Sequence, residues 1–197
     1  AMDKLIQTLI SGLSLGSIYA LIALGYTMVY GIAKMLNFAH GDIIMVGAYA
    51  VITAVFTMGL PPFIAILISI ALCALLGIVI EFLAYRPLRQ AQPLAVLITA
   101  IGVSYLLQNL ALLIYGSEQK AFPTIVALPT VHIGGVYIDG ITLATLVVTA
   151  VIMVALSLFI NKTRMGKAMR AVSEDKEAAE LMGISVNRTI TVTFAIG

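Results

Sequence analysis

The sequence predicts an all-α fold, a polytopic transmembrane helical bundle of about five spans with the start of a sixth near Thr189. Of the 197 residues, 61% are hydrophobic and 10% are charged, whereas soluble domains carry about 25% charged residues. Apolar runs such as Pro62–Ile80 and Ile141–Phe159 can each cross the ~30 Å hydrocarbon core as a helix, because a helix rises about 1.5 Å per residue. Ten of the twenty Lys, Arg, Asp and Glu residues lie between Lys162 and Arg188, which predicts a polar insert.

The hydropathy pattern places the spans in order along the chain. The predicted spans are Leu5–Tyr30, Ile43–Met58, Pro62–Ala84, Pro93–Tyr115 and Ile141–Ile160. In the first span, small residues recur every four positions, which favours close helix packing over a flexible pivot; they are Gly12, Gly16 and Ala20. The single cysteine, Cys73, lies in the third span, where we expect it to pack as a small apolar residue.

The distribution of basic residues predicts the orientation in the membrane. If segments 31–42, 85–92 and 161–188 share one side, that side carries nine of the eleven basic residues, and only Lys4 and Lys120 lie opposite. Lys and Arg accumulate in cytoplasmic loops. We therefore expect the N-terminus outside, 161–188 as a cytoplasmic loop, and 116–140 as an external loop that either meets a partner or is a solvated connection.

A polar stretch, Asn37–Asp42, interrupts the apolar sequence between the first two spans. In one interpretation it is a cytoplasmic turn, with Asp42 capping a helix that starts at Ile43. In the other it is a break in a membrane helix, whose freed backbone groups line a translocation path. Asn37, His40 and Asp42 are then candidate path residues, and the residues alone do not separate the two interpretations.

The fourth span carries a second polar insertion, Gln108-Asn109, with Thr99 upstream. Buried amides usually join membrane helices by hydrogen bonds, so substrate contact is the less favoured of two interpretations. Thr99, Gln108 and Asn109 complete the candidate path. Glu81, near the inner end of the third span, is expected to reach towards Arg86 or lipid head groups and to have no role in transport.

No grouping in the sequence has the chemistry of a catalytic or metal centre. His132 stands alone in the external loop, and no nucleophile or metal ligand lies near His40 and Asp42. We therefore expect no enzyme activity, no cofactor, no metal and no nucleic-acid partner. An ion-coupled carrier or a channel is disfavoured because no mid-membrane carboxylate or selectivity filter is evident.

Within the polar insert, residues 174–183 have the signature of a short capped helix. Ser173 is the expected N-cap, Glu174 and Glu177 place negative charge in the first turns, and Gly183 fits a left-handed C-terminal cap. A helix of about nine residues is too short to persist alone in water. It must dock either on its own membrane helices or in a groove of a separate cytoplasmic protein.

Several stretches carry a family resemblance. Glu177-Ala178-Ala179 followed by Gly183-Ile184 resembles the coupling-helix motif of ABC importer permeases, which inserts into the ATPase subunit. Four more stretches, in order and spacing, are similar to branched-chain amino-acid ABC transporter permeases of the LivH type: Leu36–Asp42, Gly47-Ala48-Tyr49, Leu97–Gly102 leading to Gln108-Asn109, and Arg170-Ala171-Val172.

The resemblance covers essentially the whole chain and implies a bacterial inner-membrane transport subunit. The implied partners are a sister permease, two cytoplasmic ATPase subunits and a periplasmic amino-acid-binding protein. Leu, Ile and Val are the implied cargo, and urea or another small amide is the alternative. Glu174, Glu177, Ala178, Ala179 and Gly183 become candidate ATPase-coupling residues. Because such permeases continue through further spans, we expect 1–197 to be one permease domain truncated at its C-terminus.

The predicted topology can be checked by cysteine labelling in intact cells. In a Cys73→Ala background, a membrane-impermeant maleimide should modify Ser117→Cys and leave Ser173→Cys unmodified, because only the first faces outside. Permeabilised cells, in which both cysteines should react, provide the control. The reverse labelling pattern would show that the chain has the opposite orientation in the membrane.

Overall fold

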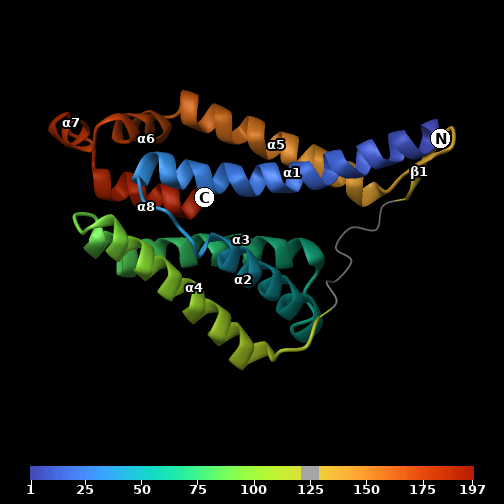
Figure 1. Cartoon of the computed structure of the whole chain (residues 1–197), viewed down its shortest axis with the longest axis horizontal. Helices are drawn as coiled ribbons and strands as arrows, with labels where there is room; N and C mark the ends of the chain where they lie inside the picture. The colour runs from blue at the N-terminus through green and yellow to red at the C-terminus, as the bar shows by residue number, and fades with distance from the viewer. Residues whose placement is uncertain (121–128) are drawn as a thin grey trace. The chain divides into compact units, whose positions relative to one another are not determined.

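The computed structural model describes residues 1–120 and 129–197 of the chain, so residues 121–128 of the predicted external loop lie outside it. Its long helices are α1 (Met2–Ala33), α2 (His40–Ile52), α3 (Pro62–Ile80), α4 (Pro93–Tyr115) and α5 (Gly140–Lys162), as Figure 1 shows. Short helices α6 (Arg164–Glu174), α7 (Lys176–Leu181) and α8 (Val186–Ile196) follow. The fold is an all-α polytopic helical bundle, as the sequence predicted.

Five helices in the described residues are long and apolar enough to cross a membrane. They agree with the predicted spans within a few residues and cover Met2–Ala33, His40–Thr57, Pro62–Leu88, Pro93–Tyr115 and Gly140–Lys162. Pro62 and Pro93 each open a helix after an extended residue, because proline fixes φ and lacks the amide hydrogen that a first turn leaves unused. The predicted sixth span corresponds to α8, which begins three residues before Thr189.

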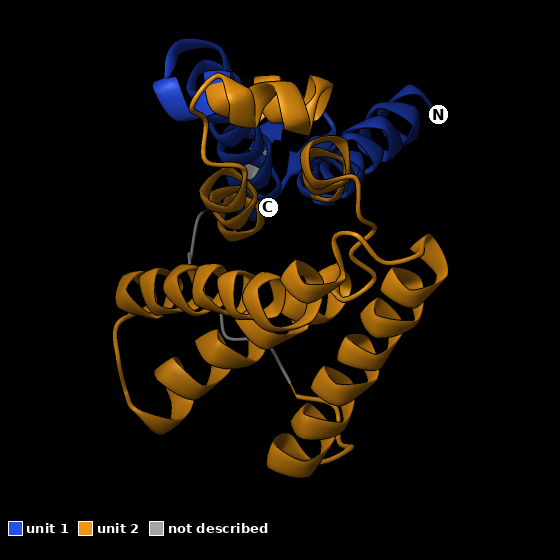
Figure 2. Cartoon of the chain, turned by 90° about the vertical axis from the view of Figure 1, so that its left-hand side faces the viewer, with its two compact units in different colours: residues 1–25, 124–167 blue, residues 26–123, 168–197 orange. Residues whose placement is uncertain are grey.

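The chain divides into two compact units, coloured separately in Figure 2: residues 1–25 with 124–167, and residues 26–123 with 168–197. In the first unit, β1 (Val131–Ile133) and β2 (Val136–Ile138) form an antiparallel hairpin. The amide of Tyr137 donates to Gln7 Oε1 at 3.1 Å, which ties the hairpin to the start of α1. The hydropathy pattern missed this hairpin because its strands have three residues each.

In the second unit, α3 packs against both α2 and α8, and α4 packs against α2. Gly47 of α2 faces Cys73 and Ser69 of α3 so closely that a Cβ would lie 2.7 Å from Cys73 Sγ. Ser69 Oγ donates to the Gly47 carbonyl at 2.8 Å. Cys73 is therefore a small packing residue, as expected, and the close approach of α2 and α3 depends on glycine at position 47.

Two helices end in a wider π-helical turn. Segment η1 (Thr53–Thr57) continues α2, and η2 (Glu81–Tyr85) continues α3 before the 3₁₀ turn η3 (Arg86–Leu88). The amide of Arg86 donates to the Glu81 carbonyl, five residues back. Such π turns are uncommon and concentrate at functional positions, and η2 begins with Glu81, whose side chain is fully buried.

The polar insert differs from the sequence prediction. Ser173 is not an N-cap, because it lies inside α6 and its hydroxyl donates to the Arg170 carbonyl at 2.6 Å. A full helix, α6, precedes α7, and its buried Met169 and Val172 could have revealed it by their spacing of three. The short helix predicted after Ser173 is α7, which starts at Lys176.

The contact between α3 and α8 sets a steric test at Gly77. A Cβ at Gly77 would lie 2.5 Å from the Phe194 carbonyl oxygen, and backbone cannot yield as a side chain can. Gly77→Ala should therefore destabilise the folded chain by about 1–3 kcal/mol, the usual cost of overpacking. Thermal unfolding in detergent measures it. Gly102→Ala is the matched control, since nothing lies within 4 Å of that position; equal stability of both variants would contradict the contact.

Candidate functional site

The connection between α1 and α2 alternates exposed and buried residues, and its buried polar residue is Asn37. Lys34, at φ +59°, ends α1 through a 2.8 Å hydrogen bond from its amide to the Tyr30 carbonyl. Asn37 is only 4% exposed, and its Oδ1 accepts from the Ala39 amide at 3.1 Å and lies 3.2 Å from Tyr85 Oη. This stretch is therefore no freely solvated turn, because Asn37 is anchored to η2.

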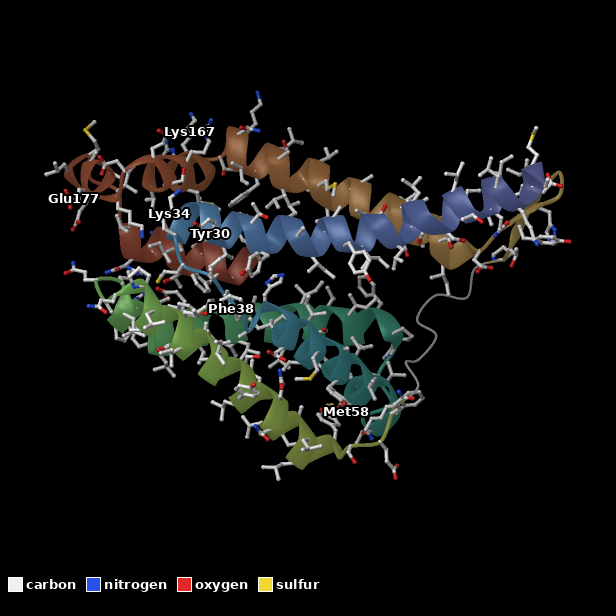
Figure 3. All side chains as sticks on the ribbon, viewed as in Figure 1. Tyr30, Lys34, Phe38, Met58, Lys167 and Glu177 are labelled. Atoms are coloured by element: carbon white, nitrogen blue, oxygen red, sulfur yellow. The ribbon has the colours of Figure 1, made fainter. Side chains whose placement is uncertain are left out.

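His40 begins α2 beside this break. Its side chain is 8% exposed, and its ring meets Tyr26 edge-on at 6.0 Å between centroids. Asn37 and His40 thus both lie in the interior of the second unit. Figure 3 marks the nearby Tyr30, Lys34 and Phe38, which the structure leaves exposed.

Asp42 does not cap α2, contrary to the first interpretation of this stretch. The helix begins at His40, its N-cap position is Ala39, and no side chain caps it. Asp42 instead accepts hydrogen bonds across to α4, from Ser104 Oγ and from Gln108 Nε2 at 3.1 Å. Asp42 thus bonds side chains of α4 and not the backbone amides at the start of α2. Both bonds are chemically suitable, because a carboxylate accepts from a hydroxyl or an amide as readily as from a helix N-terminus.

The polar stretch Asn37–Asp42 and the polar insertion of α4 therefore contact each other, but only some of their residues take part. Gln108 joins Asp42 and Ser104, while Thr99 Oγ1 donates to the Ala95 carbonyl at 2.9 Å. Asn109 Nδ2 likewise donates to a carbonyl of its own helix, that of Tyr105, at 2.7 Å. Thr99 and Asn109 are thus satisfied within α4 and do not belong to the Asp42 cluster.

Glu81 pairs with Arg86, the first of the two partners expected for it. Its side chain has 0% exposure, so it does not extend towards lipid head groups. The expected pairing with Arg86 is present at 3.2 Å, and Arg89 adds a second ion pair. Thr191 of α8 donates to the same carboxylate at 2.8 Å. No sequence signal pointed to Thr191, because it lies 110 residues further along the chain.

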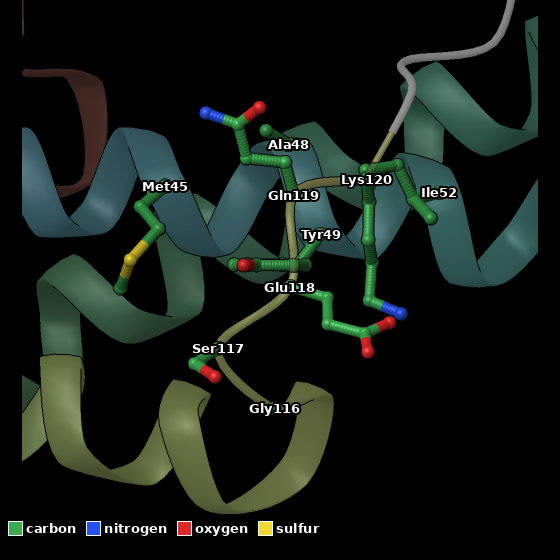
Figure 4. A pocket seen from close by; sticks show the side chains of 9 residues that line it. All are labelled: Met45, Ala48, Tyr49, Ile52, Gly116, Ser117, Glu118, Gln119 and Lys120. Carbon is green, nitrogen blue, oxygen red and sulfur yellow. The ribbon is translucent and has the colours of Figure 1, made fainter.

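A pocket of about 510 Å³ opens beside the C-terminal half of α2 (Figure 4). Its wall is Met45, Ala48, Tyr49 and Ile52, and its rim is residues 116–120. Tyr49 stacks on Tyr115 at 4.2 Å, and Thr53 Oγ1 lies 2.6 Å from Tyr115 Oη. The stack holds Tyr49, a wall residue, against the end of α4, and none of the candidate path residues lines the pocket.

The short helix α7 is capped at both ends. Asp175 Oδ1 accepts from the amides of Glu177 and Ala178 at 3.0 and 3.1 Å. At the other end Gly183 has φ +86°, and the amides of Gly183 and Ile184 donate to the carbonyls of Glu180 and Ala179. These are the two hydrogen bonds of a Schellman motif, as predicted, and they give α7 a fixed beginning and end.

The exposed face of α7 is apolar at its end. Leu181 and Met182 are 87% and 82% exposed, whereas Ala179 is 4% exposed and packs inside the chain. The small size of Ala179 therefore serves contacts with its own unit, and the outward-facing side chains are larger than the motif suggested. Glu177 and Ala178 also face outward, and Figure 3 marks Glu177.

Lys176 ties α7 to the end of α1. Its Nζ donates to the Ala33 carbonyl at 2.8 Å, which satisfies one of the carbonyls left open where α1 ends. Burial lowers the pKa of the Lys176 ammonium from its ordinary value, and the positive charges of Arg89 and Lys34 lower it further. Three cations thus converge near the start of α7.

The Asp42 cluster generates a test of coupling between α2 and α4. Asp42→Ala and Ser104→Ala should show a non-additive loss of stability, with an interaction energy of about 0.5–3 kcal/mol, because each removes the same hydrogen bond. Denaturation of the two single variants and the double variant measures it. Asp42→Ala with Thr99→Ala is the matched control cycle, which should be additive; equal behaviour of the two cycles would argue against the cluster.

Known proteins place the chain in a family. The family described as "Branched-chain amino acid transport system / permease component" matches residues 8–197. The high-affinity branched-chain amino acid transport system permease protein BraD of Pseudomonas aeruginosa is 44% identical over 98% of this chain and 66% of its own length. LivH of Salmonella typhimurium, a permease protein of the same description, is 40% identical with the same coverage.

A more distant relative is the probable branched-chain amino acid transport permease protein LivH of Methanocaldococcus jannaschii, 28% identical over 88% of this chain and 56% of its own length. No solved structure matches the chain. The chain thus spans 66% of the length of the bacterial relatives. With multiple membrane-spanning helices and a match over nearly all its residues, the chain belongs to the family of branched-chain amino acid transport system permease components.

Proposed function

We propose that this chain forms the membrane path of an ATP-driven importer that carries branched-chain amino acids across the bacterial inner membrane. Family membership supports the transport role, and the names of the relatives favour Leu, Ile and Val over urea or another small amide. In this proposal the N-terminus faces outside and residues 161–188 face the cytoplasm, as the basic residues favour.

The partners follow from the same proposal. A sister permease completes the path, a periplasmic binding protein delivers the amino acid, and two cytoplasmic ATPase subunits supply the energy. The chain itself performs no chemistry. ATP binding would close the ATPase pair, move the coupling helices, and switch the bundle between outward and inward openings. Such coupling requires that both sites bias one two-state element.

The observation that carries the proposal is the exposed apolar end of α7. Leu181 and Met182 are exposed on a helix of six residues, although its caps hold it in a fixed conformation. Water solvates such side chains poorly, and a short helix that keeps them outward fits a partner groove better than free solution. We therefore assign ATPase docking to α7 and its turn, with Glu174, Glu177, Ala178 and Gly183 at its margins and Ala179 supporting it from inside.

For the path, we assign Asn37, His40, Asp42 and Gln108 to its polar lining. Asn37 and His40 line the break between α1 and α2, and the Asp42–Gln108 contact extends this polar stretch onto α4. Thr99 and Asn109 remain candidates on α4, with roles secondary to the cluster because their side chains bond their own helix.

Leu181→Asp, in the full-length permease with its partners, should abolish both ATPase copurification and leucine uptake in proteoliposomes. A hot-spot residue contributes at least about 2 kcal/mol, roughly a 30-fold change in affinity, and a charge would be buried in place of it. The unmodified complex should take up Leu, Ile and Val in preference to urea.

Ile133→Asp is the matched control, because Ile133 is also a large exposed side chain, 64% exposed, but lies on the β-hairpin. This variant should still copurify with the ATPase and should take up leucine at the unmodified rate. If the Leu181→Asp variant still bound the ATPase and took up leucine fully, α7 would not be the docking site. Selective uptake of urea would overturn the cargo assignment.

A further inference from the structure

Glu81 is the most completely buried charge of the described residues and is held from three sides. Arg86 Nη2 lies 3.2 Å from Oε2, Arg89 pairs with Oε1, and Thr191 Oγ1 donates to Oε2 at 2.8 Å. Arg86 also lies over the ring of Phe82, 4.7 Å from its centroid. An ionisable residue in a membrane-spanning helix is costly to keep, and such residues usually serve a function.

Stability alone does not explain this cluster. Buried ion pairs gain little over well-packed apolar residues of the same volume, because desolvation offsets their attraction. Their best attested use is to fix one arrangement of helices, since any other arrangement leaves a charge unpaired. The question is therefore which elements Glu81 holds in register.

The cluster joins α3 to α8. Thr191 belongs to α8, and Arg89 also donates to Asn187 in the first turn of α8. Next to these polar contacts, the backbones of the two helices meet at Gly77 and Phe194 without room for a Cβ. Segment α8 starts directly after the Schellman turn of α7, where Ser185 caps it. A displacement of α7 thus reaches α8 through only a few residues.

Both arginines contact the Glu81 carboxylate through a terminal nitrogen, and each has a further buried donor without a partner in the described part of the chain. Each pairs with the carboxylate through Nη2, and the Nε atoms of Arg86 and Arg89 are buried without a hydrogen-bond partner among the described residues. Separating α8 from α3 would add to these unpaired donors, because Arg89 and Arg86 would lose their partners on α8.

We infer that Glu81 is a positioning residue that locks α8 to α3, so that movement of the docking helix α7 is transmitted to the membrane helices. It contacts no cargo in this role, and the inference rests on the proposed function of α7. Removing the charge should free α8 from α3 while α7 and its exposed face remain in place.

The test uses Glu81→Gln in the full-length permease assembled with its partners, because glutamine keeps the shape but loses the charge. The ATPase should still copurify, while leucine uptake per ATP hydrolysed should fall by about fivefold or more, the lower bound of typical coupling between sites. Hydrogen exchange of amides 186–196 should accelerate by a similar factor, whereas exchange in α5 should not change. Glu81→Asp, which keeps the charge, should recover part of both losses.

Asp139→Asn is the control, since Asp139 is an exposed carboxylate whose side chain caps nothing. It should match the unmodified protein in both measurements. If hydrogen exchange of the α8 amides were unchanged in Glu81→Gln, Glu81 would not lock α8 to α3, whatever the cargo is. Faster exchange with unchanged uptake per ATP would overturn the transmission role. Loss of the ATPase only in the Leu181 variant distinguishes a failure of docking from a failure of the lock.

Discussion

The structure depends on one constraint: a polar group on a membrane-spanning helix must find its partner inside the protein. Hydroxyls meet it locally, as Thr99 and Thr193 do by donating to carbonyls of their own helices. Carboxylates only accept, so each needs donors, and both membrane carboxylates also take donors from another helix. Asp42 accepts from α4, and Glu81 accepts from α8 in addition to its pair with Arg86.

These long-range pairs determine which helices stay together. The apolar faces alone specify little, since many large side chains of the membrane helices are exposed in the chain, such as Leu113 at 82% and Phe63 at 71%. Lipid or further helices can cover such faces with similar gain, because apolar packing has no strong directional preference in a bilayer. Hydrogen-bonded carboxylates, close contacts at glycine and the Asn37 anchor supply the missing specificity.

The sequence predicted the spans well because length, hydropathy and the helix-opening prolines are local signals. The sequence-based prediction was wrong where two hydrogen-bonding arrangements are chemically equivalent. Asp42 could cap its own helix or bind α4, and Ser173 and Asp175 are both good N-caps two residues apart, so only tertiary packing chose between them. Thr191 could not be predicted as a partner of Glu81, since no periodicity relates residues so far apart. Gly183 was predictable, because few other residues adopt a left-handed cap easily.

The π turn η2 determines the side from which the Glu81 carboxylate meets its arginine partners. On an α-helix the side chains that meet are three or four residues apart, yet Glu81 pairs with Arg86, five residues on, because η2 closes its turn over five residues. A turn of this kind is equivalent to one residue inserted into an ordinary helix. Removing that residue would rotate everything after it by about 100°, given 3.6 residues per turn. Deleting one residue from η2 would therefore turn both arginines to another face of the helix and leave the buried Glu81 carboxylate without its two charge partners.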